Sequence, residues 1–121
     1  MNVVLVVDDE PTIRRLVAAV LLESGCEPIT APDAETALRA ISEHKPDAII
    51  TDIRLPGMDG VEFAEKVRED EALSGVPLAF ISAFEDAPTT VLPPVTYFKK
   101  PFDVDALLEW VTTVCCTNGN S

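Results

Sequence analysis

Residues that bind cations or donate hydrogen bonds to anions follow four short apolar runs in the sequence. The adjacent acids Asp8 and Asp9 follow the first of these runs, and Asp52, Ser82 and Lys100 follow later ones. Carboxylates bind hard metal cations, a hydroxyl donates a hydrogen bond, and an ammonium supplies a point charge. A fold that gathers these side chains could hold a divalent cation next to an anionic group.

Taken singly, each of these residues has an ordinary structural role that is more frequent than a chemical one. Asp8 and Asp9 could be a helix cap and a solvated charge, and Asp52 could be a turn residue. Ser82 could satisfy a backbone group, and Lys100 could be a surface charge. Chemistry is indicated by the set as a whole, because each member stands at the carboxyl end of an expected strand.

Three neighbouring carboxylates would repel one another strongly. If Asp8, Asp9 and Asp52 meet, two charges about 4 Å apart cost about 4 kcal/mol at an effective dielectric constant of roughly 20. Without a cation, one of the three should hold a proton. An all-oxygen ligand set favours Mg²⁺ or Mn²⁺, which also accepts a phosphoryl oxygen. With the metal, Asp52 could attack phosphorus and form an acyl phosphate, while Lys100 and Ser82 contact phosphoryl oxygens.

The elements that must position these residues are indicated by the hydrophobic pattern. Apolar runs typical of strands in a parallel sheet are found at residues 3–7, 28–31, 48–51, 78–81 and 95–98. Segments of helical period alternate with these runs, which predicts an α/β fold with a doubly wound, five-stranded parallel sheet and helices on both faces. Ligands of such sheets bind at the carboxyl ends of the strands, where the residues above stand.

Start and stop signals bound the expected helices. Pro11 and Gly25 mark the beginning and end of the first helix, and Asp33 and Asp103 are expected to cap the second and the last. A further helix is expected over residues 61–73. Asp59, just before that helix, is assigned to an ordinary capping role and not to the chemistry.

Composition limits the classes of partner. A length of 121 residues is below the roughly 150 typical of one domain, so a single domain is expected. The net charge of −12 would repel phosphate backbones and anionic lipids, and we therefore expect no direct nucleic-acid or membrane partner. Cys26, Cys115 and Cys116 form an odd set, and no apolar run is long enough to span a membrane, which together indicate a cytoplasmic protein with reduced thiols.

Four sequence motifs together resemble the receiver domain of two-component response regulators. They are V-L-V-V-D-D-E-P, I-I-T-D-I-R-L-P-G-M-D-G, F-I-S-A and Y-F-K-K-P-F-D. The resemblance covers nearly the whole chain and implies a flavodoxin-like strand order 2-1-3-4-5. It also implies a receiver domain over residues 1–116, followed by a polar tail at 117–121 that is either a native end or a trimmed linker.

The resemblance implies a role for each site residue. Asp52 would be the phosphoacceptor, Asp9 a direct Mg²⁺ ligand, Asp8 a ligand through water, and the backbone carbonyl of Arg54 a further ligand. The chain would then be a phosphoacceptor that promotes its own phosphotransfer and dephosphorylation, and not an enzyme that acts on a separate substrate.

Further positions match the family's phosphoryl-binding, switch and lifetime-tuning residues. Ser82 and Lys100 would bind the phosphoryl group, and Ser82 with Tyr97 would form the switch. The ordinary alternative for Tyr97 is an edge-strand aromatic half buried against the last helix. Arg54 and Phe84 match positions that tune the lifetime of the aspartyl phosphate.

The lone histidine, His44, falls at the polar end of the second expected helix, where a solvated charge is the better interpretation. The chain is therefore not expected to be a histidine kinase or a His-phosphotransfer module. A sensor histidine kinase or a His-phosphotransfer protein is expected to donate the phosphoryl group, and an unknown downstream protein is expected to respond to it.

One segment departs from the typical receiver pattern. Pro88, Pro93 and Pro94 lie between Ser82 and Tyr97, which leaves no room for a three-turn helix. We therefore expect the family's fourth helix to be short or absent, as in a subset of receivers. The segment could become ordered on phosphorylation and report it to a partner.

Three other functions agree less well with these residues. A pseudo-receiver that binds partners without phosphorylation is disfavoured because all five acidic, hydroxyl and lysine positions are intact. A phosphatase of the haloacid dehalogenase class needs Asp-x-Asp, whereas Asp52 is followed by Ile53 and Arg54. A flavin-binding protein on a similar sheet would need a phosphate loop where Asp8, Asp9 and Glu10 stand.

Overall fold

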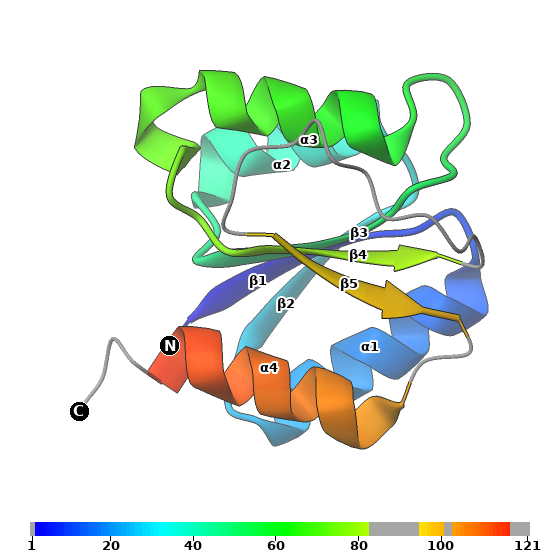
Figure 1. The fold of residues 1–121 in the computed structure, drawn as a ribbon, viewed down its shortest axis with the longest axis vertical. Coiled ribbons are helices and arrows are strands. Elements are labelled where there is room, and N and C mark those ends of the chain that lie inside the picture. The colour runs from blue at the N-terminus through cyan, green and yellow to red at the C-terminus, as the bar shows by residue number, and fades with distance from the viewer. Residues whose placement is uncertain (1, 83–94, 101–102, 117–121) are drawn as a thin grey trace.

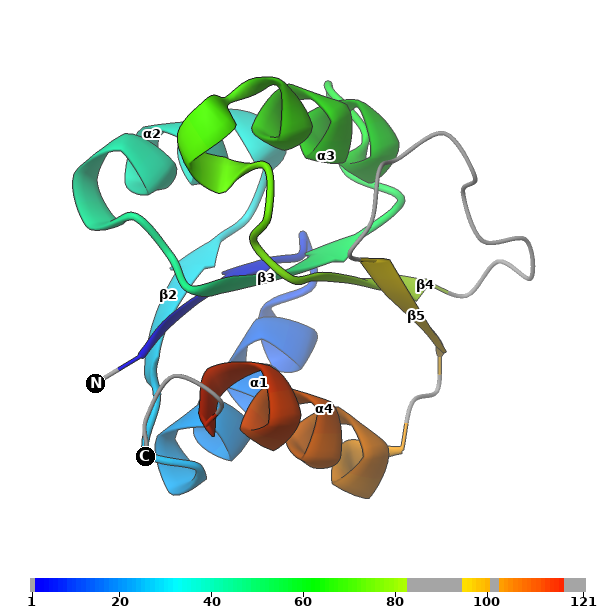
Figure 2. The same cartoon turned by 60° about the vertical axis from the view of Figure 1, so that its left-hand side comes forward.

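The computed structural model describes residues 2–82, 95–100 and 103–116. A central sheet lies between two layers of helices (Figure 1). Helices α2 (Ala34–His44) and α3 (Gly60–Glu69) cover one face, and α1 (Pro11–Glu23) and α4 (Val104–Cys116) cover the other (Figure 2). This is the doubly wound arrangement that the alternating pattern predicts.

The sheet has five strands, all parallel, in the order β2-β1-β3-β4-β5. Their bounds are Val3–Val7, Glu27–Ala31, Ala48–Asp52, Leu78–Ser82 and Val95–Lys99 for β1 to β5. The predicted strand order is confirmed, and each predicted strand lies within one residue of its observed bounds. All five residues of β3 and of β4 are buried, as expected for strands that have neighbours on both sides and helices on both faces.

Successive residues of each strand point to opposite faces, so the core has two parts. On the α2/α3 face, Leu5 of β1 and Phe80 of β4 pack with Phe63 of α3. On the α1/α4 face, Ile50 of β3 packs with Leu107 of α4. The two packed faces fix the ends of β1 and β3 relative to each other.

The helix caps are those that the sequence indicates. Asp33 accepts a hydrogen bond from the backbone N–H of Thr36 at 2.7 Å, and this contact lowers the pKa of the Asp33 carboxyl. Asp59 and Glu62 form a reciprocal capping box at the start of α3. The structural role assigned to Asp59 is confirmed.

The prediction of one continuous helix over residues 61–73 was wrong in one respect, because the observed helix is broken at Asp70. That residue has extended backbone angles (φ −84°, ψ 117°), and its carboxylate accepts from the backbone N–H of Ala72 at 3.0 Å. The Asp70 side chain thus caps a second helical segment, the short 3₁₀ helix η1 (Glu71–Leu73). Leu73 is nevertheless buried in the core, and the break makes this possible, because a continuous helix would turn Leu73 away from the face of Ala64 and Val67.

The prediction of a short or absent fourth helix concerns residues 83–94, which lie outside the described residues. Phe84 and the tail at 117–121 lie outside them as well. The helix labelled α4 is the last helix of the chain. Among the helices that the structure describes, none is long and apolar enough to cross a lipid bilayer.

Candidate functional site

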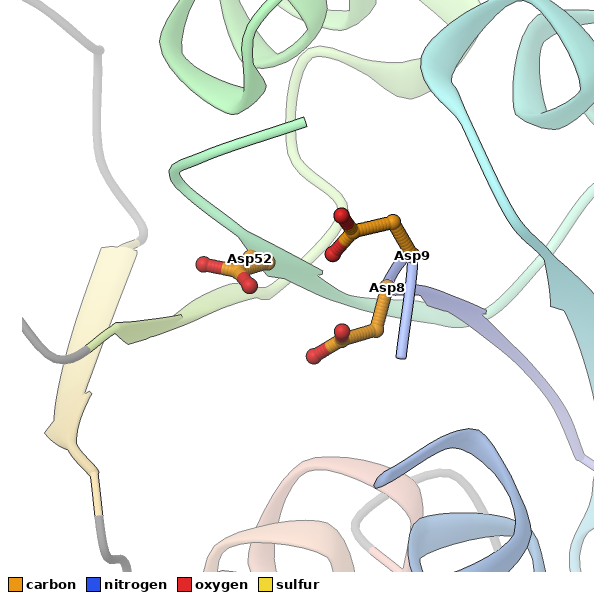
Figure 3. Close-up of side chains that lie close together, drawn as sticks. All are labelled: Asp8, Asp9 and Asp52. Atoms are coloured by element: carbon orange, nitrogen blue, oxygen red, sulfur yellow. The ribbon is translucent and has the colours of Figure 1, made fainter. Parts of the chain in front are cut away.

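The ends of β1 and β3 bring three carboxyl groups together. Asp8 and Asp9 come directly after β1, and Asp52 is the last residue of β3, which pairs with β1 through Val7 and Thr51. One carboxylate oxygen from each acid lies within 4.8 Å of the others. Figure 3 shows the three side chains gathered beyond the two strand ends. The clustering that the sequence predicts is therefore present.

Local hydrogen bonds orient the two buried acids, Asp8 and Asp52, which are 2% and 6% exposed. Asp8 Oδ1 accepts from the backbone N–H of Glu10 at 2.9 Å, and Asp52 Oδ1 accepts from that of Arg54 at 3.1 Å. The Arg14 side chain donates to the Asp8 backbone carbonyl at 2.7 Å and holds the loop after β1. In both acids this leaves the second carboxylate oxygen, Oδ2, for other partners.

Lys100 lies among these acids although it is remote from them in sequence. Its Nζ donates to Asp52 Oδ2 at 3.0 Å, to Asp8 Oδ2 at 3.2 Å and to Glu10 Oε1 at 3.3 Å. The backbone N–H of Lys100 also donates to the carbonyl of Ser82, which anchors the lysine at the end of β4. The structure thus brings Lys100 to the predicted acids.

The charges at this site are mutually dependent. Burial raises the pKa of the Asp8 carboxyl, and the nearby charge of Asp52 adds to that effect, while the Glu10 backbone N–H and the Lys100 ammonium oppose it. For Lys100, burial favours the neutral form, but hydrogen bonds and charges from Asp52 and Asp8 outweigh burial and raise its pKa. Lys100 is therefore the positive member of the cluster throughout the physiological range.

A hard divalent cation fits this donor set. Three acids face one lysine, so negative charge is left in excess, and the donors are all oxygen atoms. Mg²⁺ prefers such ligands and binds through one or two carboxylates while it retains water. Asp9, which is exposed, and the buried Asp8 and Asp52 are the residues that could hold it.

Ser82 and Tyr97 lie on neighbouring strands. Ser82 ends β4 and is fully buried. Tyr97 of β5 packs on the α2/α3 face, and its buried hydroxyl has no hydrogen-bond partner within the described part of the chain. The neighbouring Phe98 is the aromatic that faces α4, with its ring edge-on to Trp110 at 6.3 Å between centroids. The alternative that placed Tyr97 against the last helix is therefore wrong, and Phe98 takes that place.

Two residues near the site were missed from the sequence. Glu10 contacts Lys100 and could have been suspected as the third acid of the Asp-Asp-Glu run. Gly60 begins α3 so close to β3 that a side chain there would overlap the backbone carbonyl of Asp52, and its N–H donates to the Ile53 carbonyl at 2.7 Å. Gly60 stands just before the predicted start of the helix at residue 61, so no local pattern in the sequence indicated this contact.

His44 is exposed at the end of α2, 3.8 Å from the carboxylate of Glu43. This position agrees with a solvated charge at a helix end. The histidine does not belong to the cluster of Asp8, Asp52 and Lys100.

Comparison with known proteins supports one family. Residues 4–112 match the response regulator receiver domain. The chain is 33% identical to protein PilG of Pseudomonas aeruginosa over 109 residues, which cover 87% of this chain and 81% of PilG. It is also similar to the chemotaxis response regulator CheY4 of Vibrio cholerae, with a TM-score of 0.85, 32% identity, and coverage of 94% of this chain and 98% of CheY4.

Other relatives are longer than this chain. It is 32% identical to the regulatory protein AtoC of Escherichia coli and 35% identical to the DNA-binding response regulator MtrA of Mycolicibacterium smegmatis. It spans only 24% of AtoC and 48% of MtrA. The match to the family over residues 4–112 includes the acidic cluster, which fits the metal site of a receiver domain, and so the chain belongs to the response regulator receiver domain family.

Proposed function

We propose that this chain is a phosphorylation-controlled switch in which Asp52 accepts a phosphoryl group from a phosphohistidine. The main support is the position of the Asp52 carboxylate. It is buried at the end of β3, lies beside two further acids, and is contacted by the ammonium of Lys100 at 3.0 Å. Signalling switches of this kind are typical of the family and are distinct from conventional enzymes.

In the proposed transfer, an oxygen of Asp52 attacks phosphorus and forms an O–P bond. The P–N bond to the donor histidine breaks, and its electron pair stays on the imidazole, which then takes up a proton. Lys100 offsets the negative charge of the phosphoryl oxygens, and the Ser82 hydroxyl is assigned a hydrogen bond to one of them. Attack of water on phosphorus would break the O–P bond to Asp52, release inorganic phosphate and restore the carboxylate, so the chain would promote both its phosphorylation and its dephosphorylation.

Asp8, Asp9, Asp52 and the backbone carbonyl of Arg54 are the groups that would hold Mg²⁺ or Mn²⁺. When bound, the metal supplies positive charge that offsets the repulsion between the carboxylate and the phosphoryl oxygens. This metal site is supported by the proximity of the three carboxylates, which each have an oxygen within 4.8 Å of the others, and by their excess negative charge. Asp9 would bind directly and Asp8 through water.

The switch itself is assigned to Ser82 and Tyr97. The support is that Tyr97 lies on the strand next to that of Ser82 and that its buried hydroxyl has no hydrogen-bond partner among the described residues. Arg54 and Phe84 are proposed to tune the lifetime of the phosphorylated state. Arg54 is suitably placed, because its backbone N–H donates to Asp52.

A sensor histidine kinase or a His-phosphotransfer protein is the proposed donor, and an unidentified protein is the proposed receiver of the signal. MtrA is described as DNA-binding. The net charge of −12 argues against direct DNA contact by this chain. We propose that residues 1–116 act as the receiver unit in the cytoplasm.

The test is labelling by a small-molecule phosphodonor, followed as the mass gain of the intact chain. We expect labelling of the wild-type chain to require Mg²⁺ and to be lost in Asp52→Asn. The matched control is Asp59→Asn, which changes a capping aspartate outside the cluster and should leave labelling unchanged. Label that persists in Asp52→Asn would contradict the assignment, and an unlabelled wild-type chain would favour the pseudo-receiver.

A further inference from the structure

The Lys100 ammonium has more negative neighbours than the proposed transfer needs. It has three N–H groups, and three carboxylates lie within hydrogen-bonding distance, namely those of Asp52, Asp8 and Glu10 at 3.0, 3.2 and 3.3 Å. All of its donor capacity is therefore used. A phosphoryl oxygen can receive a hydrogen bond from Lys100 only if one of these contacts is given up.

Exposure decides which contact is released. The side chains of Asp8 and Asp52 are 3% and 8% exposed, so in the metal-free protein water cannot fully replace the ammonium at their carboxylates. The Glu10 side chain is 55% exposed, and water can replace the ammonium there at little cost. Glu10 is thus the partner that Lys100 can exchange most easily.

The backbone of Glu10 is fixed while its carboxylate is free to move. Its N–H donates to Asp8 Oδ1 at 2.9 Å, and its carbonyl accepts from the backbone N–H of Arg14 at 3.1 Å at the start of α1. The side chain can therefore leave Lys100 by rotation alone, without disturbing the loop that positions Asp8.

We propose that Glu10 is a positioning residue that holds Lys100 in the unphosphorylated state and is displaced by the incoming phosphoryl group. This inference rests on the proposed function and adds to it a carboxylate that competes with the phosphoryl group for Lys100. Glu10 occupies one N–H of Lys100 and places a negative charge at the entrance to an anion-binding site. Both effects slow phosphorylation of the resting protein.

Glu10→Gln tests this, because glutamine keeps the shape and removes the charge. We expect labelling at Asp52 by a small anionic phosphodonor with Mg²⁺ to be about two- to fivefold faster, the size typical of an exposed ion pair. The gain should shrink at high salt, which screens the Glu10 charge. Binding of beryllium trifluoride, a phosphoryl mimic that forms no stable covalent product, should tighten by a similar factor.

The control is Glu69→Gln, which removes an exposed acid at the far end of α3 and should change neither rate nor affinity. Urea unfolding should show that both variants fold normally. An unlabelled wild-type chain would remove the proposed function and this inference together. A labelled wild-type chain with an equal or slower Glu10→Gln variant, or with a gain independent of salt, would overturn the inference alone.

Discussion

Lys100 shows how a single side chain makes an acidic cluster tolerable. Its ammonium contacts Asp8, Glu10 and Asp52, and these contacts outweigh the effect of burial on its pKa. The same contacts keep two buried carboxylates compatible with folding in the absence of a metal. A divalent cation would perform this task better, which links metal binding to stability.

We predict that Lys100→Met lowers the free energy of unfolding by about 2 kcal/mol at neutral pH without metal. Removing one partner of a buried charge set leaves the others uncompensated, and the loss is smaller than for a fully enclosed pair because solvent reaches the site. Added Mg²⁺ should recover part of the loss.

Urea unfolding with and without Mg²⁺ provides the measurement. Lys66→Met is the control, since Lys66 is an exposed lysine on α3, away from the ends of β1 and β3 that carry Asp8 and Asp52. Equal losses in the two variants would show that Lys100 does not offset the charge of the buried acids.

The junction between β3 and α3 sets the position of Asp52. The helix begins at Gly60 under the capping box of Asp59, and its first residue lies directly against the Asp52 carbonyl. Because there is no room for a side chain at this contact, the identity of residue 60 controls where the end of β3 lies. Gly75, by comparison, has open space around its Cα.

We predict that Gly60→Ala destabilises the fold by about 1 to 3 kcal/mol, the usual cost of overpacking. It should also slow labelling of Asp52 by roughly tenfold or more, because a small displacement of a reacting group has a large effect on rate. Urea unfolding and labelling kinetics measure the two effects. Gly75→Ala should be close to wild type in both, and similar behaviour of the two variants would show that the contact at Gly60 is not tight.

Elements could be predicted from the sequence where local patterns decide them. The apolar run at Val3–Val7 and the cap at Asp33 needed no tertiary information. The break at Asp70 was missed because residues 70–73 contain no proline or glycine that would mark the end of a helix. The face taken by Tyr97 could not be predicted, because alternation along a strand separates Tyr97 from Phe98 without saying which of them faces α4.

At the scale of the whole molecule, topology brings the site together. β1 has β2 on one side and β3 on the other, and the helices that follow β1 and β2 cover opposite faces of the sheet (Figure 2). A crevice forms at the carboxyl end of a strand where the winding reverses in this way. Asp8 and Asp9 stand at that point, and Asp52 and Lys100 reach it from β3 and from the end of β5. The order of strand-end residues in the sequence was therefore sufficient to predict that Asp8, Asp52 and Lys100 lie together, but not the close approach of Gly60.

The most direct test of the account is to locate the covalent product. After treatment with a phosphodonor and Mg²⁺, borohydride reduction converts an aspartyl phosphate into homoserine, and peptide mass spectrometry identifies the position. The account predicts homoserine at position 52, and none when Mg²⁺ is removed by a chelator. Homoserine at position 8 or 9, or at position 52 to the same extent without the metal, would contradict it.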